Sequence, residues 1–129
     1  MRYSRLDALS VALLVGAALA GLALLPSLPG RIAVHFGSGG APDGYLAAPL
    51  GVVLVPVIGL LALGAVRGVV PLGRDVPAPS WFGLALAAFL AYVHGVVLAW
   101  NLGLAVNVTL FVLPAVAVVV VLAFAIDRG

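Results

Sequence analysis

Two residues of one loop have the chemistry to exchange a proton or bind a polar ligand. His35 and Asp43 stand eight positions apart in a glycine-rich stretch. If that stretch folds back on itself, the carboxylate can orient the imidazole and the two side chains can bind a ligand together. Zinc sites usually have at least three protein ligands, so the pair does not predict a metal. The competing interpretation is that Asp43 only caps a turn and that His35 packs on the membrane surface.

The second histidine, His94, lies inside an apolar segment, six residues before Trp100 and therefore about 9 Å along a helix from it. An ionisable group within a membrane span is a functional candidate that usually faces the helix bundle. His94 could meet the loop pair near one surface, or it could simply hydrogen-bond a neighbouring helix. The sequence leaves both alternatives open.

No motif indicates an enzyme. The chain has no cysteine, no zinc-protease helix, no phosphate-binding loop and no serine nucleophile elbow. We therefore predict neither catalytic residues, nor a metal, nor a cofactor. A formal charge of +2 gives no indication of a nucleic-acid partner.

Four apolar segments must position these candidate residues. Hydrophobic residues make up 65% of the chain and charged residues 8%, which is too apolar for a soluble domain. Each segment has about the 20 residues that a helix needs to cross a bilayer. The sequence predicts an all-α integral membrane protein, a four-helix transmembrane bundle in which residues 1–129 form a single domain. The expected helices are Ala8–Leu25, Ala47–Val66, Trp81–Trp100 and Val106–Ile126.

Proline and small residues modify this expectation locally. Pro56 lies in the middle of the second helix, so it should kink the helix and leave the carbonyl of Val52 without its helical donor. Small residues recur every four positions in the first helix, at Ala12, Gly16 and Ala20. Such spacing allows close packing within the chain or between two copies of it.

The first segment also has features of a cleaved signal peptide. Basic residues precede it, and Ala18-Leu19-Ala20 has the form of a cleavage site. The apolar run continues to Leu25, beyond the usual length of a signal core, which favours a retained helix.

Arginine positions predict the orientation in the bilayer. Arg31 alone would lie on one side. The others would lie on the opposite side: Arg2, Arg5, Arg67, Arg74 and Arg128. The positive-inside rule then places both termini in the cytoplasm and residues 26–46 outside, in a multi-pass protein of the cytoplasmic membrane. Arg67 and Arg74 would anchor the inner interface.

The predicted outer loop, residues 26–46, is long for a connection between adjacent helices. Apolar residues alternate at Ile32, Val34 and Phe36, which predicts a short extended segment. Residues 37–40 follow, and three of these four residues are glycine. Pro42-Asp43-Gly44 then predicts a tight turn, in which Asp43 caps backbone N–H groups. Tyr45 would lie at the membrane interface.

These loop residues resemble the membrane domain of unknown function in the N-terminal part of SdpI-type immunity proteins. The similarity covers residues 1–66. It is carried by Leu28, Pro29, Ile32, His35, Phe36, Gly40, Pro42, Asp43, Gly44 and Tyr45. The resemblance implies a non-enzymatic binding, immunity or signalling module that recognises a toxin peptide or another membrane protein on the outer face.

Five residues are the resulting binding candidates: His35, Phe36, Asp43, Tyr45 and His94. The alternatives are a structural or accessory subunit, in which the loop only seats the second helix, and a small transporter that uses His94. The lipid bilayer is the expected surroundings in each case, and a homo-oligomer is compatible with all three.

Overall fold

The computed structural model describes residues 3–69 and 78–128 and contains four long helices. They are α1 (Arg5–Ala23), α2 (Ala48–Val66), α3 (Ser80–Asn101) and α4 (Val108–Arg128). All four are long and apolar enough to span a membrane, which confirms the four predicted helices. The first begins at Arg5 rather than Ala8 because Ser4 caps it: the Asp7 N–H donates to the Ser4 hydroxyl, and the Asp7 carboxylate accepts from the Ser4 N–H.

A β-hairpin connects α1 to α2, so the all-α prediction was incomplete. A short 3₁₀ turn, η1 (Leu25–Ser27), leads to the antiparallel strands β1 (Arg31–Phe36) and β2 (Pro42–Ala47). The predicted extended segment is part of β1. The predicted turn at Pro42-Asp43-Gly44 was wrong, since those residues lie in β2.

The chain reverses direction at residues 37–41 instead. The Gly37 N–H donates to the Ala41 carbonyl over 2.8 Å, and Gly40 has a φ of +89°, which a glycine adopts without strain. The glycine-rich residues therefore form the turn of the hairpin, and Pro42-Asp43-Gly44, which also has the composition of a turn, does not. The strand pairing becomes irregular where His35 lies opposite Gly44.

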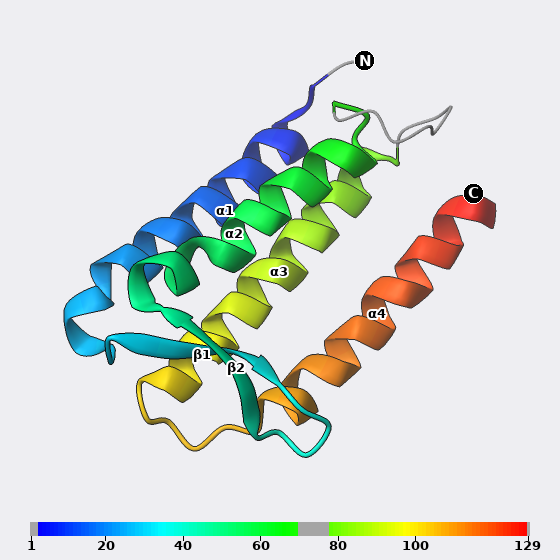
Figure 1. The fold of residues 1–129 in the computed structure, drawn as a ribbon. Coiled ribbons are helices and arrows are strands. Elements are labelled where there is room, and N and C mark those ends of the chain that lie inside the picture. Colours follow the sequence, from blue (N-terminus) through cyan, green and yellow to red (C-terminus); the bar gives the residue numbers. More distant parts are fainter. Residues whose placement is uncertain (1–2, 70–77, 129) are drawn as a thin grey trace.

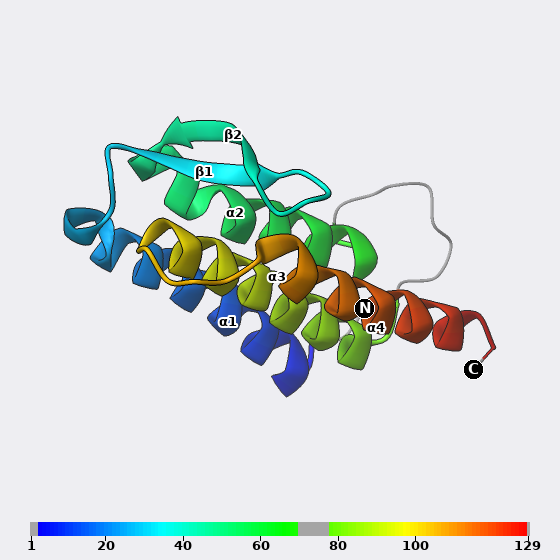
Figure 2. The ribbon, with the colours of Figure 1, turned by 90° about the horizontal axis from the view of Figure 1, so that it is seen from below.

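Three helices form the body of the molecule and the fourth lies at its edge. Figure 1 shows α1, α2 and α3 side by side, with α4 set apart along α3, and Figure 2 gives the same arrangement from below. Val108 is the one buried residue among the described side chains of α4. The predicted four-helix bundle is thus a three-helix bundle with a peripheral helix. Lipid tails can cover the exposed apolar surface of α4.

The two ends of the molecule differ. The start of α1, the end of α2, the start of α3 and the end of α4 lie at one end, which we call the inner end, and the hairpin lies toward the other, the outer end (Figure 1). An even number of helices requires this arrangement. It agrees with the predicted grouping of the chain termini and the 67–80 connection.

Glycine and proline allow α1 and α2 to approach closely. Pro56 lies inside α2, as predicted, and it is also buried. A Cβ placed on Gly21 would lie 2.8 Å from the carbonyl oxygen of Val52, which is the oxygen that Pro56 leaves without its helical donor. Gly21 therefore provides the close contact between these helices.

The small residues singled out in the first helix do not make that contact. Ala12, Gly16 and Ala20 are exposed, and a Cβ on Gly16 would meet no atom within 4 Å. Their spacing is not used for packing within the described chain.

Candidate functional site

The hairpin packs on the helix bundle through the face that is directed at α2 and α3. Ile32 is fully buried, and a Cβ on Gly51 would lie 2.5 Å from carbon atoms of its side chain. Ile32 packs in a cluster with Ala48 and Val52 from α2 and Leu98 from α3. Ile32 thus packs β1 against the outer turns of two helices, although burial in β1 does not alternate strictly, since the adjacent Ala33 is also fully buried.

Asn101, the last residue of α3, fixes the free edge of β1. Its Oδ1 accepts from the Ala33 N–H over 2.8 Å, and its Nδ2 donates to the Ala33 carbonyl over 2.9 Å and to the Val97 carbonyl over 2.8 Å. The side-chain amide therefore satisfies both backbone groups of a fully buried residue, as a third strand would do.

The turn of the hairpin is attached to the start of α4. The Thr109 hydroxyl donates to the Gly37 carbonyl over 2.7 Å. Asn107 caps α4, since its Oδ1 accepts from the Leu110 N–H over 3.1 Å. The Asn107 side chain also packs so closely on Gly40 that a Cβ there would lie 2.5 Å from Oδ1. Both connections make the hairpin a fixed element of the fold.

Replacing Gly40 by alanine should test this attachment. Gly40→Ala introduces a Cβ at a positive φ and against Asn107, so we expect a loss of about 1–2 kcal/mol in the free energy of unfolding. Gly39→Ala is the matched control, because a Cβ at Gly39 has no neighbour within 4 Å and its φ is not positive. Denaturation of both variants in detergent gives the comparison. Equal stability would contradict close docking of the turn.

His35 and Asp43 meet on the outer face of the hairpin. The His35 Nδ1 and Asp43 Oδ1 atoms are 2.5 Å apart, and the two side chains are 75% and 55% exposed. Of the two alternatives, the pairing is therefore the one that is formed, and the expected backbone cap by Asp43 is not. In the described part of the chain, no group of three or more histidine, cysteine or acidic residues is arranged to hold a metal.

Phe36 and Tyr45 have different surroundings. Phe36 packs edge-on against Trp100 of α3, with ring centroids 5.4 Å apart. Tyr45 is 48% exposed and belongs to the exposed side of β2. Phe36 thus contributes to the seat of the hairpin, whereas Tyr45 remains available at its surface.

An apolar cleft of about 290 Å³ lies between β1, α3 and the start of α4. We call it the outer cleft. Its lining residues are Val34, His35, Phe36, Val93, Val97, Val108, Thr109, Val112 and Leu113. His35 and Thr109 are its polar members, so the His35–Asp43 pair stands beside a surface that is otherwise hydrocarbon.

His94 has a different environment from the hairpin pair. It is buried in the bundle, where its Nε2–H donates to the carbonyl of Ala17 in α1 over 2.8 Å. This contact supports the structural alternative, a hydrogen bond to a neighbouring helix. His94 does not line the outer cleft, so three of the predicted candidates, His35, Phe36 and Asp43, are brought together and His94 is not among them.

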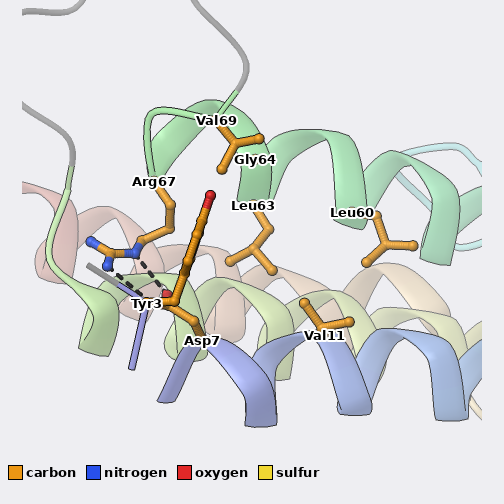
Figure 3. Close-up of a pocket in the computed structure, with 8 residues that line it drawn as sticks. All are labelled: Tyr3, Asp7, Val11, Leu60, Leu63, Gly64, Arg67 and Val69. Carbon is orange, nitrogen blue, oxygen red and sulfur yellow. Dashed lines mark hydrogen bonds and ion pairs between the residues drawn. The ribbon is translucent and has the colours of Figure 1, made fainter. Parts of the chain in front are cut away.

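A second polar arrangement, at the inner end, was missed in the sequence. The Arg67 Nε and Nη2 atoms donate to the two carboxylate oxygens of Asp7 over 2.7 and 3.0 Å (Figure 3). The Arg67 Nη1 atom donates to the Ala78 carbonyl over 2.6 Å. Both charged side chains are only 12% exposed. The signal was available, because an acidic residue at the start of one span and a basic residue at the end of the next must share an end of the bundle.

The other arginines predicted at this interface are only partly described. Arg2 and Arg74 lie outside the described residues, and Arg5 is exposed at the first position of α1. Arg67 is therefore better defined as a partner of Asp7 and Ala78 than as a free interfacial anchor.

Comparison with known proteins gives one finding. No curated protein and no solved structure gives a significant match to the chain. One family model matches part of the chain. The matched segment begins within α1, spans the hairpin and ends within α2, and the ten loop residues from Leu28 to Tyr45 that carry the resemblance described above lie inside it. Residues 12–60 match the family model of a domain of unknown function (DUF1648).

Proposed function

We propose that this protein is a non-enzymatic recognition module of the cytoplasmic membrane, with its hairpin outside the cell and both termini in the cytoplasm. The grouping of five of the six arginines, by chain order, at the inner end supports this orientation under the positive-inside rule. Kinship with SdpI-type immunity proteins, through the resemblance of the loop, is part of the proposal.

One observation carries the binding role. The hairpin is held by Asn101, Thr109 and the Phe36–Trp100 contact, yet it presents an exposed His35–Asp43 pair beside an apolar cleft. Packing does not require either polar side chain. Exposed polar residues on a rigid element beside an apolar cleft are typical of a binding site.

The chemistry of this surface indicates what it would recognise. An apolar side chain of a peptide, or of a segment of another membrane protein, would enter the outer cleft, and a polar group next to it would contact His35, Asp43 or Tyr45. Binding is proposed rather than catalysis because the pair is open to solvent. Proton transfer is usually tuned in sites that exclude water.

A growth assay tests the proposal. Cells that lack the gene would be challenged with membrane-active peptides and complemented with the wild type, His35→Ala, Asp43→Asn, or Val112→Trp, which fills the outer cleft. We expect all three variants to lose protection. The yield of His35→Ala and Asp43→Asn in the membrane should stay the same, because both side chains are exposed and such changes alter stability by less than about 0.5 kcal/mol. Val112 is partly buried, so the yield of Val112→Trp is measured beside its protection.

The matched control is Arg31→Gln, an exposed change on the same hairpin that does not line the outer cleft. It should protect like the wild type. Deletion without any change in peptide sensitivity would count against immunity. Protection by all three variants at normal yield would count against the site.

An accessory membrane subunit is the second candidate. It is favoured by α4, whose apolar side chains are largely exposed, since another membrane protein could pack on them as well as lipid. Co-purification from native membranes that depends on α4 rather than on His35 and Asp43 would favour this alternative. The transporter hypothesis has less support, because the candidate His94 is hydrogen-bonded to Ala17 in the bundle.

A further inference from the structure

We propose that a groove at the inner end, between α1 and α2, binds one acyl chain of an anionic phospholipid. This groove is separate from the outer cleft and independent of the function proposed above. Its volume is about 210 Å³. Figure 3 shows it with the residues that line it: Tyr3, Asp7, Val11, Leu60, Leu63, Gly64, Arg67 and Val69.

The groove is polar at one end and apolar along the rest of its length. The Asp7–Arg67 ion pair lies at one side of the view in Figure 3, and Leu63, Val11 and Leu60 extend away from it. Leu63 is buried, whereas Val11 and Leu60 are partly open to the outside of the bundle, where lipid would be. An amphipathic molecule with a polar head beside the ion pair would place its hydrocarbon along these side chains.

The groove is closed toward the middle of the membrane. A Cβ on Gly59 would lie 2.8 Å from the side chain of Leu14, which is fully buried, so α1 and α2 are in contact there. Asp7 and Leu14 are seven residues apart, which corresponds to about 10 Å of helix. This length accommodates the upper part of one acyl chain.

Residues at the polar end suit the membrane interface. In Figure 3 the ring of Tyr3 stands across the gap between the two helices, with its hydroxyl directed toward the end of α2. Val69 folds back over that end, since its N–H donates to the Gly64 carbonyl over 2.7 Å. A tyrosine with one polar atom is favoured at the level of the headgroups, where it can contact a lipid phosphate.

Charge complementarity indicates an anionic headgroup. By chain order, five arginines and three of the four aspartates belong to the inner end, so this end holds the whole formal charge of +2. Arg31 and Asp43 cancel at the outer end. Asp7 does not repel an anion strongly because Arg67 neutralises it. Basic residues near a membrane surface favour anionic lipids over zwitterionic ones.

Native mass spectrometry of the detergent-purified protein tests the proposal, with phosphatidylglycerol and phosphatidylcholine of identical acyl chains as probes. We expect one tightly held phosphatidylglycerol and at least a fivefold preference over phosphatidylcholine. Val11→Trp and Leu60→Trp should abolish this binding by filling the groove. Leu13→Trp and Leu61→Trp are the matched controls, because these neighbours are exposed and do not line the groove.

Two further variants keep the test decisive. Leu60→Phe narrows the groove with a side chain that is larger than leucine but smaller than tryptophan. It is used if the tryptophan variants fail to fold. Arg5→Gln should reduce the preference for phosphatidylglycerol about fivefold without preventing acyl-chain binding. Equal binding of the two lipids by the wild type would overturn the proposal. So would retention of the lipid by well-folded variants with a filled groove.

Discussion

Replacing Asp7 by leucine should lower the free energy of unfolding by about 2–4 kcal/mol. The change leaves the guanidinium of Arg67, which is 12% exposed, without the carboxylate that accepts two of its hydrogen bonds. Removing one partner of a buried ion pair costs about 3–5 kcal/mol, and an exposed pair contributes less than about 1 kcal/mol. The position of this pair at the end of the bundle places the expected loss between those limits.

Two variants separate the ion pair from the helix cap that Asp7 also forms. Ser4→Ala removes the capping hydroxyl alone and should cost about 1 kcal/mol. The double variant Asp7→Leu/Arg67→Leu should recover more than half of the stability lost by Asp7→Leu, because it removes the buried guanidinium together with the carboxylate that accepts from it. Chemical denaturation in detergent micelles measures all three. A loss for Asp7→Leu no greater than that for Ser4→Ala would contradict the assigned role of the pair.

The helices could be predicted from sequence because hydrocarbon imposes a strong pattern on it. A run of about 20 apolar residues with no charge has few alternatives in lipid. Local propensity alone would have misled at Val116–Val121, which is helical within α4 although its residues favour strands. The peripheral position of α4 was not predictable in this way, because lipid and protein neighbours are equally apolar and leave no pattern on a helix face.

The hairpin was only half predictable because two turn signals competed. Residues 37–40, three of which are glycine, and Pro42-Asp43-Gly44 each have the composition of a turn, and only one of them can reverse the chain at the register that β1 needs. The contact of Asn107 with Gly40 and the bond from Thr109 to Gly37 favour the first. These contacts connect residues about 70 positions apart, which local sequence cannot reveal.

The candidate site shows the same division between local and distant information. The pairing of His35 with Asp43 was one of two alternatives that followed from their separation of eight residues across a glycine-rich segment. The role of Asn101 could not be predicted in this way. An asparagine at the end of a helix more often caps a turn than bonds the backbone of a strand edge as a neighbouring strand would. His94 was recognised as a candidate from its place in a span, but its partner was a backbone carbonyl, which no residue pattern encodes.

Replacing Gly21 by alanine should destabilise the protein by about 2–3 kcal/mol. Its Cβ would lie 2.8 Å from the Val52 carbonyl oxygen and 3.2 Å from Nε2 of His94, so α1 would have to move away from α2 and α3 together. Overpacking a well-packed contact costs about 1–3 kcal/mol, and the upper part of this range applies because a backbone atom cannot move as a side chain can. The hydrogen bond from His94 to Ala17, one turn away, should lengthen as well.

Gly16→Ala is the matched control for this prediction. Gly16 lies in the same helix, but a Cβ there has no neighbour within 4 Å, so the higher helix propensity of alanine should make the variant about 0.5–1 kcal/mol more stable. Thermal unfolding in one detergent compares both variants with the wild type. The opposite signs are the informative result, because both changes add the same methyl group to one helix. Stabilisation by both would mean that α1 and α2 are not in contact where Pro56 leaves the Val52 carbonyl free.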